Sequence, residues 1–599
     1  MILTSRNSKT SKGYTIPSFE RRRVGSHPRS LLIILILSVV FWGVIGGRLF
    51  YLQLVEGSRY HQLAINNRIR LISNQPTRGR ILDRDGRELA GSRLSYAVYV
   101  WAFAVREPSW ENTRKQVARL LSISEIEIQK RLEQVDQESP FLFRIAQDIS
   151  PAQVTAFQER MTDLPGVVVN TETVRYYPNN ELAAHALGYL GEISGEELQQ
   201  RTNEGYRLGD VVGQMGVEAA FEQQLRGDRG GQQIEIDGTG QVVRVLGEKL
   251  ARPGQDVQLT LDLDLQKAAE SALGNREGAI VALASETGEV LAMVSHPAFN
   301  PNLFTSQINA TQWQQLQSKK FPFVNRALQG YPPASTFKIV TTTAALESGR
   351  YSRSTVLQTS PYLNLGGIKF WEWNRSGFGQ LDFVGAMANS SNTFFGSVGM
   401  GVGETTLIRW ARKFGLGQKT GIELGGEAHG LVPDAAWKQK IFNEDWYPGD
   451  TVNFSLGQGA IQATPLQVAV MFAAIANGGA RVTPHLKKGS EASTQRQSVD
   501  LSTETLQVIQ EGLRAVVVRG TGQALNSSSL PPIAGKSGTA EDPPRQSHAW
   551  FGAYAPADNP EIVVVAFAEN SGGGGGSIAG PMVKQVLAAY FEPELALQP

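Results

Sequence analysis

The pattern of hydrophobic and polar positions divides the chain into three parts. An uncharged apolar run covers residues 31–47 and continues through "RLFYLQL". It therefore reaches about 20 residues, the length at which a helix crosses the hydrocarbon core of a bilayer. Polar and apolar residues then alternate in short steps as far as about residue 255. Longer apolar segments begin at residue 256, which indicates a further folded domain.

The apolar run predicts an uncleaved membrane anchor at residues 30–52. Bulky residues 49–52 follow it, whereas a cleaved signal peptide has a shorter core and a small-residue cleavage site. Residues 1–29 contain one acid, Glu20, and a cluster of basic residues: Arg6, Lys9, Lys12, Arg21, Arg22, Arg23 and Arg29. A basic flank stays on the cytoplasmic side. We therefore expect a single-pass protein with everything after about residue 53 outside the cytoplasm.

Local patterns predict several elements in the two outer segments. In residues 53–255, "TRGRILDRDGRELA" predicts a hairpin around Asp85-Gly86, and apolar spacings of three and four predict helices within 109–162. In residues 256–592 we expect a helix ending at Gly274, two strands joined by "SETGE", strands at 548–556 and 560–570, and a closing helix after a glycine loop at 572–576. Residues 593–599 form a tail.

Composition excludes some classes of function. The 599 residues include no cysteine, so disulfides, thiolate nucleophiles and cysteine-bound metals are absent. The formal net charge of +1 argues against a nucleic-acid-binding protein, which needs a concentrated basic face. The content of 41% hydrophobic and 19% charged residues is typical of folded protein.

Three short motifs in the second outer segment contain candidate catalytic residues. They are Ser335-x-x-Lys338, Ser390-x-Asn392 and Lys536-Ser537-Gly538-Thr539. Each alone is weak, because Ser335 could simply cap a helix. A serine hydroxyl needs a base to become a nucleophile. No histidine lies near Ser335 in the sequence, and a lysine serves if burial and a second positive charge, here Lys536, lower its pKa.

In this order the motifs match those of the penicillin-interacting serine acyltransferases. "YPPASTFK", "SLGQGAIQATPLQVA", "RGRILDRDGRELA" and "HALGYLGEIS" resemble class B penicillin-binding proteins of the penicillin-binding protein 2 type. The resemblance implies a multidomain α/β (α+β) fold. A pedestal or dimerisation-type domain would occupy 53–255. A transpeptidase domain at 256–592 would have an antiparallel sheet flanked by helices, like the serine β-lactamases.

The resemblance also implies a role for each motif residue. Ser335 would be the acylated nucleophile and Lys338 its base. Ser390 and Lys536 would relay a proton, and Asn392 would hydrogen-bond the substrate amide. The residues Ser537, Gly538 and Thr539 would bind substrate along an edge strand, and the N–H groups of Ser335 and Thr539 would form the oxyanion hole.

Three departures from the usual motifs concern single positions. Ala334 replaces a more usual glycine, Ser391 replaces the aspartate of many relatives, and Ser537 stands where threonine is common. The functional atoms are kept at the last two positions. Residues 351–389 contain neither cysteine nor histidine, so we expect none of the metal sites that some relatives carry there, and no cofactor.

By this resemblance the protein would be a D,D-transpeptidase that cross-links peptidoglycan stem peptides during cell-wall elongation and is a target of β-lactams. A glycan polymerase of the SEDS family and cell-shape proteins would be its partners at the bacterial plasma membrane. The alternatives are a division-specific transpeptidase, a β-lactam sensor, a hydrolase on the same fold, or a scaffold whose catalysis is dispensable.

Overall fold

The computed structural model describes residues 28–59, 69–133, 142–207, 209–236, 242–305, 308, 310–317 and 320–592. The predicted tail at 593–599 and the predicted basic tail, except its residues 28 and 29, lie outside these residues. The chain divides into two units, residues 1–70 with 235–244 and residues 71–234 with 245–599.

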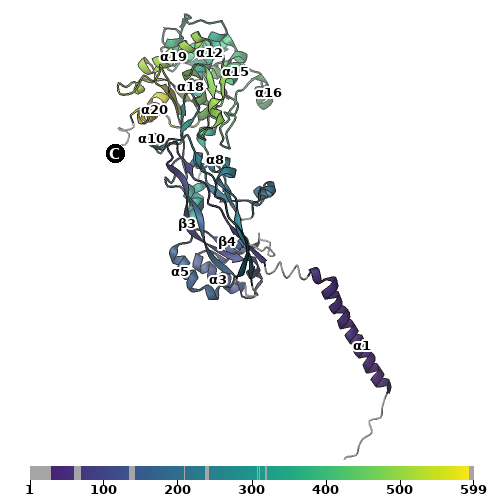
Figure 1. Ribbon diagram of the computed structural model, residues 1–599. Helices are drawn as coiled ribbons and strands as arrows, with labels where there is room; N and C mark the ends of the chain where they lie inside the picture. Colours follow the sequence, from purple (N-terminus) through teal and green to yellow (C-terminus); the bar gives the residue numbers. More distant parts are fainter. Residues whose placement is uncertain are drawn as a thin grey trace, which may run out of the picture. The chain divides into compact units, whose positions relative to one another are not determined.

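The first unit contains the helix α1, Pro28–Phe50, which continues as a short π-helix, η1, over Tyr51–Val55 (Figure 1). Its large apolar side chains are exposed along its length, as at Leu31 and Trp42. Among the described residues one helix, Leu31–Val55, is long and apolar enough to cross a membrane. The anchor predicted at 30–52 is therefore confirmed as an apolar helix of spanning length.

The pedestal region, which we define as the described residues from 69 to 255, has the long strand β3 at its centre. β3 spans Glu88–Trp101 and pairs antiparallel with β5, Val167–Tyr176, and with β4, Leu142–Ala146. The helices predicted within 109–162 are present. In the first of them, Trp110–Leu121, the buried residues are spaced by three and four, which places them on one face. The intervening strand β4 was not predicted.

The other helices and strands of this region are all shorter than β3. Its helices are α3 (Trp110–Leu121), α4 (Glu125–Glu133), α5 (Pro151–Glu159), α6 (Ala184–Leu187), α7 (Gly195–Gln200), α8 (Gly216–Ala220) and α9 (Glu222–Leu225). Its other strands are β1 (Ile69–Asn74), β2 (Ile81–Leu82), β6 (Leu190–Glu192), β7 (Val211–Gly213), β8 (Gly230–Ile236) and β9 (Val242–Lys249).

The C-terminal region, which we define as the described residues from 256 to 592, contains a five-stranded antiparallel sheet. Its order is β12-β11-β21-β20-β19, from Val290–His296, Gly278–Ala284, Ile562–Ala568, His548–Ala555 and Ala534–Ala540 respectively. The two strands around "SETGE" and the two at 548–556 and 560–570 are confirmed. The antiparallel sheet flanked by helices that the resemblance implied is also confirmed.

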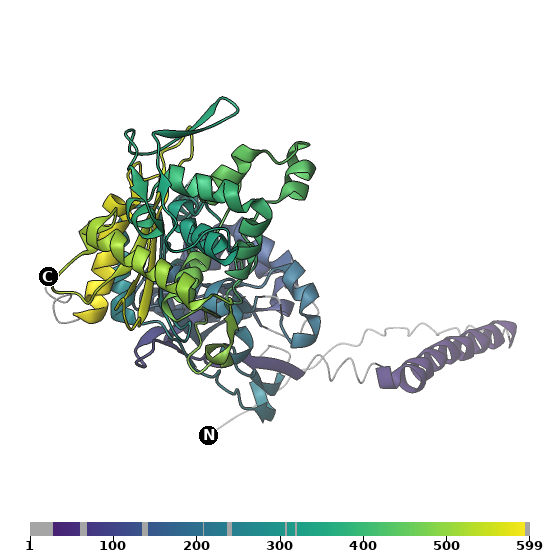
Figure 2. The same ribbon diagram turned by 90° about the horizontal axis from the view of Figure 1, so that it is seen from above.

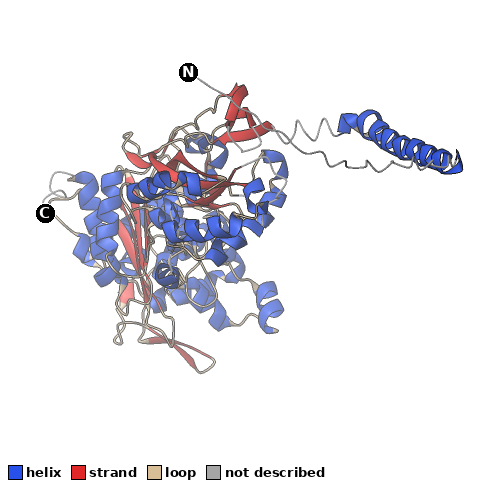
Figure 3. Cartoon of the chain, turned by 90° about the horizontal axis from the view of Figure 1, so that it is seen from below, coloured by secondary structure: helices blue, strands red, loops and turns tan. Residues whose placement is uncertain are grey.

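Helices cover both faces of this sheet (Figures 2 and 3). Ile280 and Ala282 of β11 pack with α10 and α20, whereas Val281 and Leu283 pack into the cluster that contains α12 and α18. Burial on both faces explains why these strands are continuous apolar runs rather than alternating ones. The helices are α10 (Leu263–Leu273), α11 (Ala310–Leu316), α12 (Lys338–Glu347), α13 (Phe383–Asn389), α14 (Asn392–Val402), α15 (Glu404–Lys413), α16 (Ala435–Phe442), α17 (Pro448–Ser455), α18 (Pro465–Ala476), α19 (Thr503–Arg519) and α20 (Gly575–Phe591).

Short two-stranded pairs complete the region. They are β13 (Leu357–Gln358) with β16 (Gln380–Leu381), β14 (Tyr362–Leu365) with β15 (Ile368–Trp371), and β17 (Ala480–Val482) with β18 (Arg496–Ser498). The strand expected after residue 256 is only Val257–Gln258, β10, and it pairs parallel with β2 of the pedestal region. The two regions therefore share a sheet at this point. Close approach at Gly254 permits it, because a Cβ there would lie 1.8 Å from the carbonyl oxygen of Leu225.

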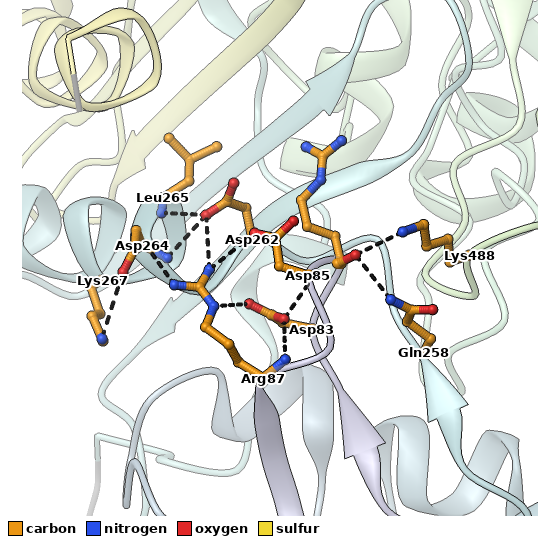
Figure 4. A network of polar contacts seen from close by, with 10 residues as sticks. Asp83, Asp85, Arg87, Gln258, Asp262, Asp264, Leu265, Lys267 and Lys488 are labelled. Atoms are coloured by element: carbon orange, nitrogen blue, oxygen red, sulfur yellow. Dashed lines mark hydrogen bonds and ion pairs between the residues drawn. The ribbon is translucent and has the colours of Figure 1, made fainter. Parts of the chain in front are cut away.

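The hairpin predicted around Asp85-Gly86 is present and joins the two regions (Figure 4). The fully buried Asp83 accepts hydrogen bonds from Asp85 N at 2.9 Å, Arg87 N at 2.8 Å and Arg87 Nε at 2.7 Å. Arg87 Nη1 also donates to Asp264 Oδ2 in α10 at 2.6 Å. The carbonyl of Arg84 accepts from Gln258 and Lys488. These contacts make the hairpin a polar clasp between the regions.

We expect Asp83→Ala to destabilise the folded protein by about 2 kcal/mol, because it removes the buried acceptor of Arg87 Nε and of the partly buried N–H groups of Asp85 and Arg87. Chemical denaturation of the full chain in detergent measures this loss. Lys115→Ala is the control, since it removes only the exposed ion pair with Glu111 and should leave stability unchanged. Equal stability of both variants would contradict the clasp.

Candidate active site

Ser335 and Lys338 lie where a short 3-10 helix, Ala334–Phe337, runs into α12. The preceding prolines start this turn, and Ser335 forms no side-chain cap of the helix. The serine is therefore left half-buried one turn before Lys338, as the motif predicted. α12 ends at Glu347, just before Gly349 with a φ of +69°, the left-handed conformation that glycine commonly takes after a helix.

Ala334 takes a backbone conformation that favours glycine. Its φ is +52°, and its N–H donates to the carbonyl of Gly457 at 2.8 Å. A residue with a Cβ costs about 1–2 kcal/mol there relative to glycine. Alanine in place of glycine at this position therefore introduces backbone strain directly before Ser335.

The second motif occupies the junction between two helices. Ser390 follows the last residue of α13 with a φ of +52°, and Ser391 is the N-cap of α14, accepting a hydrogen bond from Phe394 N at 3.2 Å. Asn392 is the first residue of α14. A left-handed residue followed directly by a capping serine turns the chain sharply, which directs Ser390 and Asn392 toward Lys338.

The side chains of the three motifs meet at the hydroxyl of Ser390. Lys338 Nζ lies 3.3 Å from Ser390 Oγ, 2.7 Å from the Ser390 carbonyl oxygen and 3.0 Å from Asn392 Oδ1. Lys536 Nζ donates to the same Oγ at 2.8 Å and to the Ser537 carbonyl at 2.9 Å. One hydroxyl therefore bridges two buried amines that come from distant parts of the chain.

Burial sets the charge of these lysines. Both are fully buried, and burial lowers the pKa of Lys338 to about 7, against the opposing effect of the Glu372 carboxylate. Burial and then the charge of Lys338 lower the pKa of Lys536 well below its usual value. The expected lowering of the Lys338 pKa is thus present, but burial is its cause, and the repulsion between the lysines acts on Lys536.

Strand β19 brings Lys536, Ser537, Gly538 and Thr539 to the edge of the sheet, where the motif was expected to lie. Ser537 Oγ lies 2.6 Å from Thr521 Oγ1, and Thr539 is exposed. The carbonyl of Thr539 accepts a hydrogen bond from Gln458 Nε2 at 3.0 Å, in the loop after α17. This contact already uses one polar group of the edge strand.

The glycine tract at 572–576 packs against the same strand. α20 begins at Gly575, inside the tract that was expected to be a loop. The N–H of Gly575 donates to Thr539 Oγ1 at 3.2 Å. A Cβ at Gly575 would lie 2.2 Å from the Trp550 carbonyl oxygen and 2.4 Å from that of Gly538, so glycine permits this close approach.

Sequence patterns did not identify Glu372, which lies directly after β15. It is fully buried, and its carboxylate accepts hydrogen bonds from Ser391, Asn392 and Thr393. No local pattern distinguishes it, because its partners are about 20 residues further along the chain. Gln458 and Thr521 were missed for the same reason. Among the described residues there is no cluster of three or more histidine or acidic side chains placed to hold a metal ion.

The structure therefore brings four of the five predicted catalytic residues together around one centre. Lys338, Ser390, Asn392 and Lys536 are joined by hydrogen bonds, and the substrate-binding candidates lie on the strand that carries Lys536. Lys338 contacts Ser390 and Asn392, and no hydrogen bond joins it to Ser335 in the described part of the chain. An amine with a pKa of about 7 can accept a proton near neutral pH, and a strand at the edge of a sheet can bind an extended peptide.

Comparisons with known proteins identify the family of the chain. The family model "Penicillin binding protein transpeptidase domain" matches residues 278–588, and "Penicillin-binding Protein dimerisation domain" matches residues 73–259. The chain is 34% identical to peptidoglycan D,D-transpeptidase MrdA of Acinetobacter baumannii, over 90% of this chain and 84% of that protein. It is 31% identical to MrdA of Escherichia coli K12, over 93% of each chain.

A solved structure shows the same architecture. The complex of penicillin-binding protein 2 with MreC from Helicobacter pylori matches with a TM-score of 0.79 at 29% identity, covering 88% of this chain and 100% of that one. The chain belongs to the class B penicillin-binding proteins, within the penicillin-binding protein 2 group of peptidoglycan D,D-transpeptidases.

Proposed function

We propose that this protein cross-links peptidoglycan stem peptides during cell-wall elongation through an acyl-enzyme on Ser335. The observation that carries the proposal is the bridge of Lys338, Ser390 and Lys536, with Ser335 one turn from Lys338. It supplies a nucleophile, a base with a pKa of about 7, and a second hydroxyl for proton transfer. The relatives named peptidoglycan D,D-transpeptidase support the choice of substrate.

The first half-reaction acylates the enzyme. Lys338 accepts the proton of Ser335 as Oγ bonds to the carbonyl carbon of the penultimate D-alanine. The amide C–N bond then breaks, and the terminal D-alanine leaves as an amine after receiving a proton through Ser390, beside Lys536. In the second half-reaction the amine of a neighbouring stem peptide attacks the ester, its proton returns through the same groups, and Ser335 is released.

The edge of β19 positions the substrate. An extended peptide would add beside Lys536–Thr539 as a further strand, with its terminal carboxylate near the side chains of Lys536, Ser537 and Thr539. Asn392 would hydrogen-bond the peptide amide. The N–H groups of Ser335 and Thr539 would stabilise the oxyanion, and each such donor is typically worth about 3 kcal/mol in the transition state. β-Lactams would acylate Ser335 in the same way.

The anchor and the relatives support a cellular setting. The basic flank of α1 would stay in the cytoplasm, so the pedestal and C-terminal regions would lie outside the plasma membrane. Penicillin-binding protein 2 of Helicobacter pylori has been solved with MreC, and another related structure is described as a peptidoglycan synthase complex. We therefore assign this chain cell-shape proteins and a SEDS-family glycan polymerase as partners.

Incubation of the full chain in detergent with a penicillin should give one covalent adduct, observed by intact mass and lost in Ser335→Ala. Ser348→Ala, at the other end of α12, is the matched control and should be acylated normally. The adduct should persist for hours, because a transpeptidase does not hydrolyse it rapidly. Fast loss of the adduct would indicate a hydrolase, and an adduct that survives in Ser335→Ala would disprove the assignment of the nucleophile.

The rate of acylation should rise with pH around a midpoint near the pKa of Lys338, about 7. Protonated Lys338 cannot accept the proton of Ser335, so the rate falls below this midpoint. Stopped-flow measurement with a fluorescent penicillin over a range of pH checks this expectation. Circular dichroism at each pH serves as the control for folding, and a rate that is constant across the midpoint would contradict the role of Lys338.

The orientation can be tested with proteinase added to spheroplasts that contain the full chain. The outer part should be degraded and a short fragment that includes α1 should be protected, because only the basic flank faces the cytoplasm. Inside-out membrane vesicles provide the control and should protect the outer part. The opposite pattern would show that the anchor is inserted the other way.

A further inference from the structure

Glu372 connects the segment after β15 to the start of α14. Its side chain is fully buried. Oε2 accepts hydrogen bonds from Ser391 Oγ at 2.6 Å, Thr393 N at 3.0 Å and Thr393 Oγ1 at 3.0 Å. Oε1 accepts from Asn392 N at 3.0 Å and from Trp373 N at 3.1 Å. One carboxylate therefore contacts three consecutive residues, 391–393, and the neighbour of Glu372 itself.

These contacts fix the helix start that carries the second motif. The first N–H groups of a helix have no partner within the helix, and a carboxylate beside them is favoured by the helix dipole. Ser390, directly before this start, has a left-handed backbone conformation that persists only where its surroundings hold it. Glu372 holds the adjoining residues from one side, while Lys338 and Lys536 contact Ser390 from the other.

We propose that Glu372 is a positioning residue for the transpeptidase reaction, whose buried carboxylate holds Ser390 Oγ and Asn392 Oδ1 against the amine of Lys338. The inference rests on the proposed function, since it assigns a part of the same acylation step. Glu372 does not touch substrate or the reacting atoms. It acts through Ser391, Asn392 and Thr393, which it contacts directly.

The negative charge of the Glu372 carboxylate also acts on the amine of Lys338. The charged groups that face Lys338 are Glu372 and, from β19, Lys536. The helix α14, which packs against α12, carries no charged residue, and the aromatic ring of Phe395 lies 5.5 Å from Lys338 Nζ. Charged side chains of α15 and α19 contribute no shift to the pKa of Lys338. Glu372 therefore opposes the effect of burial by favouring the ammonium form.

Glu372→Gln tests both the hydrogen bonds of the carboxylate and its charge, because it keeps the size of the side chain and removes the charge. The acylation of Ser335 should become slower by about 10²-fold, the usual cost of a displacement near 1 Å in an active site. Loss of the negative charge lowers the pKa of Lys338, so the pH midpoint of acylation should move to lower pH. A purely structural role would slow the reaction and leave the midpoint unchanged.

The matched control is Glu427→Gln, another buried glutamate, whose carboxylate binds Thr420 N at 2.8 Å and Thr420 Oγ1 at 2.6 Å. It should keep the wild-type rate and midpoint. Glu372→Asp keeps the charge and withdraws the carboxylate by one methylene, so it should be slow with an unchanged midpoint. This variant tests the inference if Glu372→Gln does not fold.

The measurement uses the full chain in detergent, a fluorescent penicillin over a range of pH, and intact mass to locate the adduct. Glu372→Gln with an unchanged midpoint overturns the inference, whether or not its rate falls, and so does a folded Glu372→Asp that reacts as fast as the wild type. Failure of the wild-type chain to form an adduct on Ser335 overturns the proposed function instead, so the two failures are distinguishable.

Discussion

The site depends on the burial of two amines on either side of one hydroxyl. Lys338 and Lys536 are fully buried, and both contact Ser390 Oγ. A buried ammonium costs several kcal/mol, and two of them repel each other, so proton loss is the cheaper outcome. The layers of helix on both faces of the sheet, which keep this centre dry, therefore determine its basicity as much as the residues themselves do.

The sequence was informative wherever a local pattern determines the structure. The strand pairs β11–β12 and β20–β21, the hairpin at Asp85-Gly86 and the apolar helix all follow from periodicity and turn residues within a short window. The three motifs were found because the resemblance to a known family assigned a role to each residue. Their mutual hydrogen bonds required the folded chain.

The remainder depended on contacts between segments distant in sequence. Glu372 is one of 56 acidic residues, and nothing beside it in the sequence shows that its carboxylate binds residues 391–393. Arg87 likewise donates a hydrogen bond to Asp264, which is 177 positions away in the sequence. A hairpin that resembles an ordinary surface turn therefore connects the pedestal and C-terminal regions. β10 pairs with the pedestal hairpin for the same reason. Patterns of period two or 3.6 carry no information on such partners.

The hydrogen bond from Gln458 to the carbonyl of Thr539 has a consequence for self-association. An unpaired strand edge attracts any extended chain, including the same edge of a second molecule. Here an arriving strand exchanges one hydrogen bond for another instead of gaining a new one. A second strand that offers backbone groups alone therefore gains little at this edge. Gln458 thereby makes the edge of β19 less prone to pair with the same edge of a second molecule.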